Sequence, residues 1–214
     1  VGPYLAFRNH QRQQITAEEV GTKLGWPVYV KPANLGSSVG VHRVPDPQAL
    51  DAAVDDAFRY DRKIVIEAAI PGREIECAVL GSASAAEASI AGEVAPAGVH
   101  THYSYEAKYL DPAGANLSIP ADIPDAAMCR VRELAVQVFH ALECEGLGRV
   151  DVFLKPDGEV IINEINTLPG FTAISMYPKL WEHTGLPYPR LIDRLLDLAL
   201  KRAEEENTLS RTLP

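Results

Sequence analysis

Two short segments in the last third of the chain alternate between apolar and polar residues, and this pattern predicts the two strands of a β-hairpin. Residues 149–154 and 160–166 follow the two-residue period of a strand. Between them, Lys155-Pro156-Asp157-Gly158 is rich in turn-forming residues. The chain then continues into a tight glycine turn at residues 166–170 and a short predicted helix.

The register of this hairpin decides which polar side chains lie together. Arg149, Asp151 and Phe153 share one face of the first strand. A four-residue turn places Arg149 opposite Glu164, and a two-residue turn places Asp151 opposite Glu164. Both registers gather the same side chains, whereas a three-residue turn would break the parity. On the second strand, the alternation predicts one shared face for Val160, Ile162, Glu164 and Asn166.

The rest of the chain predicts a mixture of helices and strands after a connecting segment at residues 1–14. Thr16 and Asp46 stand where helix N-cap residues are expected. Strands are predicted at 26–32, 41–44, 63–67, 73–80 and 86–94. Helices are predicted at 16–24, 46–58, 125–143 and from 187 until the charged segment at 201, where fraying is expected. The inward faces of the two longest helices are predicted to be Met128, Val131, Leu134, Ala135, Val138 and Leu142, and Leu191, Ile192, Leu195, Leu196 and Ala199.

Composition narrows the class of protein. The chain has 214 residues, 47% hydrophobic and 23% charged, which suits one large or two small globular domains. A net charge of −9 and the lack of a basic patch argue against general nucleic-acid binding. We find no signal peptide and no apolar run long enough to span a bilayer, so a cytoplasmic location is expected. The three cysteines have no CxxC spacing and are predicted to be reduced, buried thiols.

The hairpin carries the strongest candidate chemistry. Asp151, Glu164 and Asn166 are all oxygen donors, and magnesium prefers carboxylates together with substrate phosphates. The alternative is a half-exposed polar sheet face without a ligand. The glycine turn after Asn166 favours the first interpretation, because backbone N–H groups at such a turn can hold an anion.

Three further segments carry weaker signals. Lys31 ends a predicted strand and precedes the glycine-serine loop 33–40, which lacks the Walker A pattern and could equally be a hairpin turn. Glu74 and Glu76 form an acidic stripe that is usually solvated. Residues 95–115 predict a long loop of the kind that often acts as a lid. Its His100 and His102 lack a further ligand at suitable spacing for a metal.

The motifs 148–151, 163–172 and 175–178 closely resemble those of D-alanine–D-alanine ligases, members of the ATP-grasp superfamily. The resemblance extends over almost all of the chain. It implies an α+β fold of two α/β subdomains with mainly antiparallel sheets sandwiching the nucleotide. Residues 1–80 would form the small subdomain, with the glycine-serine loop, and 81–214 the large one, with an ω-loop and the metal site. The family's amino-terminal substrate domain is expected to be absent, so that the chain alone would have little ligase activity.

The resemblance also implies the reaction. Two D-alanines would be joined with ATP and two Mg²⁺ or Mn²⁺ ions, through an acylphosphate, to make D-alanyl-D-alanine for peptidoglycan, by a homodimer in the full-length enzyme. Tyr109 favours an amine over D-lactate as the second substrate. Two alternatives remain: a ligase with a different carboxylate and amine pair, such as D-alanine with D-lactate, and a non-catalytic ATP-binding domain.

The resemblance assigns roles residue by residue. Asp151, Glu164 and Asn166 would hold the metal ions, and Arg149, the backbone of Gly170 and Ser175 would act on the reacting groups. Ser37, Lys108 and Tyr109 would join the catalytic set, and Tyr103 and Met176 would contact substrate with Tyr109, Arg149, Gly170 and Ser175. The nucleotide set would be Lys31, Ser37, Glu67, Ala68, Ile70, Glu74, Lys108, Phe153, Asn163 and Glu164.

Overall fold

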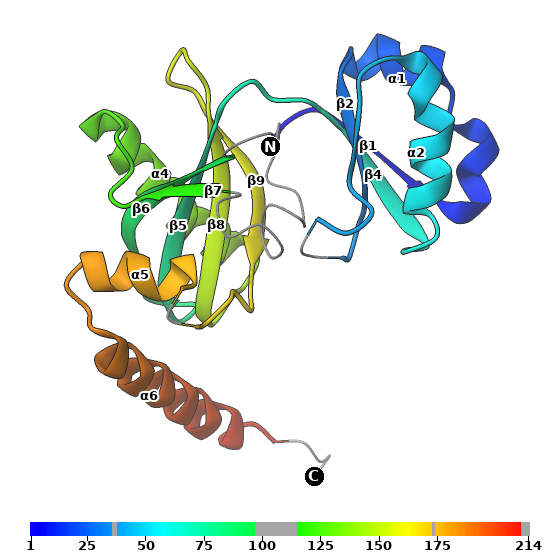
Figure 1. The fold of residues 1–214 in the computed structure, drawn as a ribbon. Helices are drawn as coiled ribbons and strands as arrows, with labels where there is room; N and C mark the ends of the chain where they lie inside the picture. Colours follow the sequence, from blue (N-terminus) through cyan, green and yellow to red (C-terminus); the bar gives the residue numbers. More distant parts are fainter. Residues whose placement is uncertain (36–37, 97–114, 173, 211–214) are drawn as a thin grey trace. The chain divides into compact units, whose positions relative to one another are not determined.

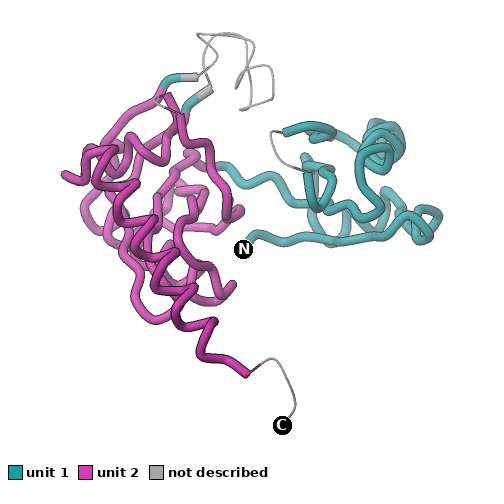
Figure 2. The backbone as a smooth tube through the Cα atoms, turned by 90° about the horizontal axis from the view of Figure 1, so that it is seen from below, with its two compact units in different colours: residues 1–71, 95–116 teal, residues 72–94, 117–214 magenta. Residues whose placement is uncertain are grey.

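The computed structural model describes residues 1–35, 38–96, 115–172 and 174–210. The chain forms two compact units, one of residues 1–71 and 95–116 and the other of residues 72–94 and 117–214 (Figure 2). No helix in these described ranges combines the length and the apolar character that crossing a membrane requires. Two antiparallel sheets with helices confirm the predicted α+β class.

The first unit is a four-stranded sheet with its helices packed on one face (Figure 1). The strand order is β1-β4-β2-β3, and the printed pairings are antiparallel. Alternation places Val28, Val30, Ile64 and Ile66 in the core beneath the helices. The strands are β1 Tyr4–Arg8, β2 Val28–Pro32, β3 His42–Val44 and β4 Lys63–Ala68, and the helices are η1 Asn9–Gln14, α1 Ala17–Leu24, η2 Pro47–Ala49 and α2 Leu50–Ala57.

The predicted helix starts in this unit are confirmed by their caps. The Thr16 hydroxyl accepts from the backbone N–H of Glu19, and the Asp46 carboxylate accepts from the N–H groups of Gln48 and Ala49. The connecting segment expected at residues 1–14 instead contains β1 and η1. β1 pairs along its length with β4, from Tyr4 opposite Glu67 to Arg8 opposite Lys63, a long-range contact that local sequence pattern does not encode.

The second unit is a five-stranded sheet with a helix over each face. The strand order is β7-β6-β5-β8-β9. Because β5 pairs here with β6 and β8, the units divide before residue 72 and not at the boundary of 80 expected from sequence. Helix α4 packs on the face of Ile75 and Cys77, and α5 begins over the opposite face (Figure 1). The elements are β5 Arg73–Gly81, β6 Ala86–Pro96, β7 Ala115–Ser118, α4 Asp125–Ala141, β8 Gly146–Leu154, β9 Val160–Asn166, α5 Met176–His183 and α6 Tyr188–Asn207.

The turn of the central hairpin has three residues, the length that was expected to separate the polar side chains. The backbone N–H of Lys155 donates to the carbonyl of Glu159, so three residues form the turn, with Gly158 in the left-handed region at φ 87°. A β-bulge between Asp151 and Val152 then restores the parity, because Asn163 is inserted on β9. Asp151 therefore lies opposite Glu164, as expected for the two-residue turn.

The bulge also corrects the predicted faces of β9. Val160 and Ile162 lie opposite Leu154 and Val152 and pack in the core under α4, not beside Glu164. Beyond Asn163 the alternation is reversed, so Ile165 joins the core while Glu164 and Asn166 lie on the opposite face. The prediction of one shared face for all four residues was wrong.

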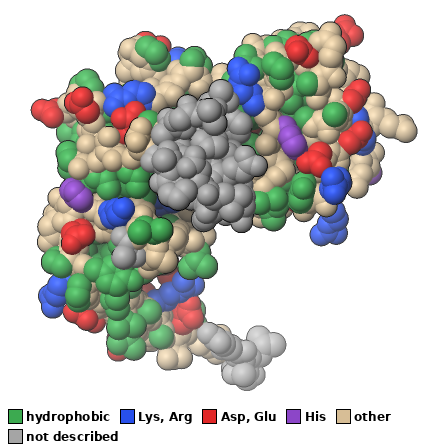
Figure 3. Space-filling model, viewed as in Figure 1, with side chains coloured by type: hydrophobic (Ala, Val, Ile, Leu, Met, Phe, Trp, Pro, Cys, Tyr) green, Lys and Arg blue, Asp and Glu red, His purple; other side chains and the backbone are tan. Residues whose placement is uncertain are grey.

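The predicted inward faces of the two longest helices are confirmed in part, and in α4 Met128 and Val138 pack partly buried against the core as predicted. In α4 the buried residues are Val131, Leu134, Ala135 and Phe139, whereas Leu142 is 59% exposed because the helix ends at Ala141. In α6 only Leu191 is buried, and Ile192 and Leu196 are exposed, so hydrophobic side chains gather on the surface along this helix (Figure 3). Helix α6 also continues through its charged end to Asn207 instead of fraying at residue 201.

The cysteines are free, as predicted, but they are not all buried. Cys77 lies in the core of the second unit, where burial raises the pKa of its thiol to about 12. Cys144 is also buried, and burial raises its pKa. Cys129 is exposed on α4, so one of the three predicted burials was wrong.

Replacing Phe139 should test the packing of α4 against the sheet. Phe139→Ala removes a fully buried ring and should lower the free energy of unfolding by about 3 to 5 kcal/mol. Leu142→Ala, three residues further along and exposed, should change it by less than about 0.5 kcal/mol. Urea unfolding followed by circular dichroism measures both. Equal losses would contradict the observed face of the helix.

Candidate functional site

The face of the second sheet opposite α4, called the open face below, carries three rows of cross-strand neighbours on strands β5, β8 and β9. Glu74, Phe153 and Ile161 are cross-strand neighbours in the first row. Glu76, Asp151 and Glu164 make the second row. The third row is Ala78, Arg149 and Asn166. Rows on one strand are two residues apart, which corresponds to about 6.6 Å along the strand.

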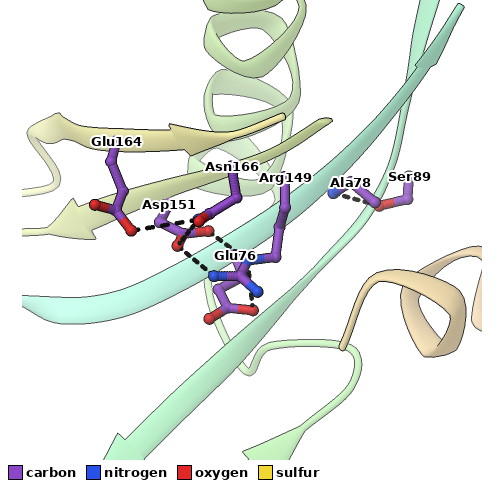
Figure 4. Close-up of polar contacts among 7 residues, drawn as sticks. All are labelled: Glu76, Ala78, Ser89, Arg149, Asp151, Glu164 and Asn166. Atoms are coloured by element: carbon purple, nitrogen blue, oxygen red, sulfur yellow. Dashed lines mark hydrogen bonds and ion pairs between the residues drawn. The ribbon is translucent and has the colours of Figure 1, made fainter. Parts of the chain in front are cut away.

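Arg149 is the centre of the polar contacts on this face (Figure 4). Its Nε and Nη2 atoms donate to the two oxygens of Asp151 at 2.7 and 2.6 Å, a bidentate pair. Its Nε also lies 3.1 Å from Oε2 of Glu76, which reaches it from β5. The Arg149 side chain is only 18% exposed, so the guanidinium is largely withdrawn from water between two carboxylates.

Asn166 connects the two acids of the hairpin. Its Nδ2 donates to Asp151 Oδ2 at 3.0 Å and to Glu164 Oε1 at 3.3 Å. The amide therefore bridges Asp151 and Glu164 from the end of β9, and Figure 4 shows the three side chains turned toward one another. Asp151, Glu164 and Asn166, which were predicted to act together, lie on one face.

The charges of this cluster do not cancel. Glu76, Asp151 and Glu164 supply three carboxylates, and Arg149 supplies one guanidinium. Burial alone would lower the pKa of Arg149, but the charges of Asp151, Glu76 and Glu164 and the hydrogen bonds to Asp151 raise it above its ordinary value. The guanidinium is therefore charged throughout the physiological range, and the excess negative charge favours a cation or a further cationic group.

The backbone beneath Arg149 is held by a second bulge, in β6. Between Cys77 and Val79 the β5–β6 register shifts, and the N–H of Ala78 donates to the hydroxyl of Ser89 at 3.1 Å instead of to a strand carbonyl. Ser89 is fully buried, so this bond satisfies a donor that would otherwise be stranded. Ala78 lies opposite Arg149, so the hydrogen bond to Ser89 stabilises β5 at the position beside Arg149 (Figure 4).

Gly92 lets α5 approach the same face. It lies opposite Glu76, and a Cβ there would meet Leu180, Ile119 and Met176 at 3.0 to 3.2 Å. The lack of a side chain therefore brings the amino-terminal end of α5, with Met176, onto the sheet. The buried Tyr177 donates from its hydroxyl to the carbonyl of Val79 at 2.9 Å and fixes the helix there.

Gly170 and Ser175 lie together in the turn before α5. A Cβ on Gly170 would be 2.9 Å from the Ser175 hydroxyl oxygen, so only glycine fits this approach. The same hydroxyl oxygen accepts from the N–H of Thr172 at 3.1 Å and lies 2.9 Å from the Thr172 hydroxyl. The turn thus keeps Gly170 and Ser175 as neighbours.

The first unit contributes a separate group of predicted nucleotide residues. Lys31 on β2 pairs with Glu67 on β4, Nζ to Oε2 at 2.7 Å, with the two side chains 21% and 30% exposed. The N–H of Ala68 donates to the carbonyl of Pro3, and that of Ala69 to the carbonyl of Pro27. Ala68 could therefore meet a base only through its carbonyl, and Ile70 follows on the connector.

The profile of the family described as D-ala D-ala ligase C-terminus matches residues 1–197 of this chain. The chain belongs to this family.

Individual ligases agree with that assignment. The chain is 51% identical over 204 residues to the D-alanine--D-alanine ligase of Oceanobacillus iheyensis, covering 95% of this chain and 55% of that protein. It is 48% identical over 213 residues to D-alanine--D-alanine ligase A of Escherichia coli K12, covering 100% of this chain and 58% of that protein. The chain thus spans about half the length of the relatives it matches.

Two solved ligase structures share the fold. One is the D-alanine-D-alanine ligase from Coxiella burnetii, with a TM-score of 0.82 and 36% identity over 97% of this chain and 54% of that one. The other is the VanG D-Ala:D-Ser ligase from Enterococcus faecalis, with a TM-score of 0.82 and 34% identity over 92% and 56%. The predicted ATP-grasp fold is thereby confirmed.

Several residues of the predicted ligase site lie outside the described ranges. These are Ser37 in the glycine-serine loop, and Tyr103, Lys108 and Tyr109 in the segment expected to form the ω-loop. His100 and His102, for which no metal role was expected, also lie outside the described ranges. Asn163 is described, and it is the inserted residue of the β9 bulge.

The three residues predicted to hold metal ions do not by themselves surround a cation. Among the described residues, no three His, Cys, Asp or Glu side chains are arranged to hold a metal ion. Asp151 and Glu164 with the amide of Asn166 instead make a set of two acids and one neutral donor. This fits magnesium, which takes one or two carboxylates and fills its remaining positions with waters and substrate phosphates.

Sequence reasoning missed Glu76. The alternation placed it correctly on the face of Glu74, but it was expected to be solvated, whereas it is only 6% exposed and contacts Arg149. A signal was available, because every residue from Ile75 to Leu80 other than Glu76 is apolar, as in strands that are buried on both faces.

Removing Arg149 should expose the repulsion among the acids. Arg149→Met leaves Asp151 and Glu76 buried without their shared cation, and should lower the free energy of unfolding by about 3 kcal/mol in the presence of a chelator. The double variant Arg149→Met/Asp151→Asn should lose less than the sum of the single variants, by about 1 to 3 kcal/mol. Urea unfolding measures the cycle.

A surface arginine provides the control for this cycle. Arg130 is 53% exposed and 3.6 Å from Glu133, so Arg130→Met should change stability by less than about 0.5 kcal/mol. Strictly additive losses for Arg149 and Asp151 would show that the bidentate pair does not form in solution.

Proposed function

We propose that this chain is the nucleotide-binding and catalytic portion of a D-alanine–D-alanine ligase, which joins two D-alanines with conversion of ATP to ADP and phosphate for peptidoglycan synthesis. The observation that carries the proposal is the convergence of Arg149, Asp151, Glu164 and Asn166 on one sheet face of a chain that is half identical to such ligases. An inactive relative would be expected to lack one of these groups.

The three rows of the sheet suit a nucleotide that lies along the strands. Phe153 and Ile161 offer apolar surface for a base, and Glu74, opposite Phe153, offers two carboxylate oxygens to a ribose diol. The next row, with Asp151 and Glu164, would lie by the phosphates. The third row, with Arg149, would meet the reacting end. In this order, successive parts of the substrate meet successive rows about 6.6 Å apart.

Asp151, Glu164 and Asn166 would hold the divalent ions, with Glu164 shared between two sites. Bound there, magnesium or manganese would neutralise the phosphate oxygens during phosphoryl transfer. Asn166 now points its Nδ2 at both acids, so its amide would turn to offer Oδ1 to a cation. Asp151 would exchange part of its contact with Arg149 for the cation.

The reaction would proceed in two balanced steps. A carboxylate oxygen of the first D-alanine attacks the γ-phosphorus of ATP, and ADP leaves. The amine of the second D-alanine then attacks the carbonyl carbon of the acylphosphate, and phosphate leaves with the proton that the amine loses. Arg149 and the N–H of Gly170 would stabilise the negative oxygen of the tetrahedral state, and one such donor is worth about 3 to 4 kcal/mol. Ser175 and Met176 would hold the carboxylate of the second D-alanine.

The remaining roles follow the family resemblance and belong to the proposal. Lys31 would reach the ATP phosphates, and Glu67, Ala68 and Ile70 would read the base. Ser37, Tyr103, Lys108 and Tyr109 would close over the phosphates and the second substrate. The proposal also includes a homodimeric, cytoplasmic enzyme, since ATP and the free thiols suit that compartment.

One alternative deserves a direct test because a D-Ala:D-Ser ligase is among the matching structures at the same TM-score. Among the solved structures, that ligase is 34% identical and the Coxiella burnetii D-alanine-D-alanine ligase 36%, whereas the curated D-alanine--D-alanine ligases reach 48% to 52% identity, which favours D-alanine as the second substrate. The other alternative is a non-catalytic ATP-binding domain, against which the presence of all four site groups argues.

The full-length product of the gene should release phosphate from ATP in a reaction that requires magnesium and D-alanine, and should form D-alanyl-D-alanine. D-Serine and D-lactate, offered with D-alanine, should compete poorly. The 214-residue chain alone should show little turnover. Magnesium-dependent ATP binding without D-alanine-stimulated phosphate release would favour the non-catalytic alternative, and equal turnover by the short chain would contradict its proposed dependence on further sequence.

Replacing Glu164 should show whether its carboxylate binds the metal ion or only adds negative charge to the hairpin. Glu164→Gln should lower kcat by about 10-fold to 100-fold and raise the magnesium concentration needed for half-maximal rate. The control is Glu159→Gln in the turn of the same hairpin, where the side chain is 56% exposed and pairs with Lys155, and kcat should stay within about twofold. Similar losses in both variants would refute the metal assignment.

A further inference from the structure

We propose that Glu76 is a positioning residue that holds the Arg149 guanidinium in place while Asp151 binds the cation. The proposal rests on the proposed function, because it concerns the residue expected to stabilise charge in the reaction. Neither the sequence pattern nor the family resemblance assigned Glu76 a role.

The geometry places Glu76 where such a holder is needed. It lies on β5 directly opposite Asp151, and its Oε2 is 3.1 Å from Arg149 Nε. Asp151 holds the same guanidinium from β8. The guanidinium is therefore bound by carboxylates from two different strands, and Figure 4 shows it between them.

Only one of these two carboxylates is also a candidate metal ligand. Asp151 lies within hydrogen-bond distance of Asn166 and opposite Glu164, the other members of the metal set. If an oxygen of Asp151 coordinates a cation, its hydrogen bonds with Arg149 become weaker. Glu76 lies one strand further from Glu164, so it can keep its contact with Nε while Asp151 turns to the cation.

The burial of Glu76 supports a specific role. Its side chain is 8% exposed, between Gly92 on β6 and Asp151 on β8. A carboxylate so far from water is costly unless a cation compensates it, and the guanidinium of Arg149 lies 3.1 Å away. The ion pair therefore ties the position of the Arg149 guanidinium to a carboxylate in the middle of the sheet.

A similar ion pair on the same sheet shows what a purely structural role would look like. Glu93 on β6 binds Arg73 with two hydrogen bonds, of 2.7 and 2.6 Å, and its side chain is 16% exposed. Glu93 lies opposite Ile75, so it is on the other face of the sheet from Arg149. Glu93→Gln thus breaks a comparable arginine pair without touching the candidate site.

The first experiment tests the contact in the 214-residue chain without any assay of activity. Glu76→Gln and Arg149→Met are combined in a double-mutant cycle of urea unfolding. Their effects should be coupled by at least about fivefold in the unfolding equilibrium constant, and the cycle of Glu93→Gln with Arg149→Met by less than about twofold. Absence of coupling between Glu76 and Arg149 would overturn the proposal.

The second experiment tests positioning in the full-length product of the gene. Glu76→Gln should lower kcat by about 10-fold to 100-fold with the KM for ATP within about threefold, because Arg149 would act on charge that develops only in the transition state. Glu76→Asp, which keeps the charge, should recover part of the rate. Glu93→Gln should keep kcat within about twofold.

A kinetic cycle distinguishes positioning from loss of structure. In an Arg149→Lys background, Glu76→Gln should change kcat by less than about twofold, because its effect passes through the guanidinium. An equal fall in both backgrounds, or an unchanged kcat in the single variant, would overturn the proposal. An inactive wild-type protein would instead refute the proposed function, while the unfolding cycle would still decide whether Glu76 holds Arg149.

Discussion

The attraction between one guanidinium and a row of carboxylates is the interaction on which the open face of the second sheet depends. Glu76, Asp151 and Glu164 are cross-strand neighbours, and unit charges about 5 Å apart repel by about 3 kcal/mol at an effective dielectric constant of about 20. Arg149 binds two of these acids, and the Asn166 amide donates to Asp151 and Glu164. Without them, such a row would favour protonation of at least one acid.

The second constraint is parity along the hairpin, and it is met by two irregularities that compensate each other. A three-residue turn with Gly158 shifts the β9 alternation by one residue, and the insertion of Asn163 shifts it back. Between the turn and the bulge, β9 pairs Val160 and Ile162 with core residues. Past the bulge it presents Glu164 and Asn166 to the acids and Arg149. Without the inserted residue, Glu164 would lie on the face that α4 covers.

These features explain how far the sequence could predict the molecule. Local signals found most elements: the Thr16 and Asp46 caps, the alternating strands and the grouping of Arg149 with Asp151 all follow from short-range periodicity. The bulge at Asn163 could not be found this way. The face on which Glu164 lies depends both on the length of the turn and on the presence of a bulge, and the alternation of residues cannot distinguish a two-residue turn without a bulge from a three-residue turn with one. The burial of Glu76 depends on strands far away in sequence. Phe139, and not Leu142, packs on the sheet because α4 ends earlier than its apolar pattern.

The charge of this face bears on the form in which a nucleotide would bind under the proposed function. Among the described residues, the second and third rows hold three carboxylates and one guanidinium, which leave two formal negative charges, and a fully ionised nucleoside triphosphate would add to this repulsion. A divalent cation is attracted to the same face, since the single guanidinium of Arg149 faces the three carboxylates of Glu76, Asp151 and Glu164. The nucleotide should therefore enter with its cation and not before it. Glu76 then matters most after this step, because Arg149 must remain charged and oriented once Asp151 is shared with the cation.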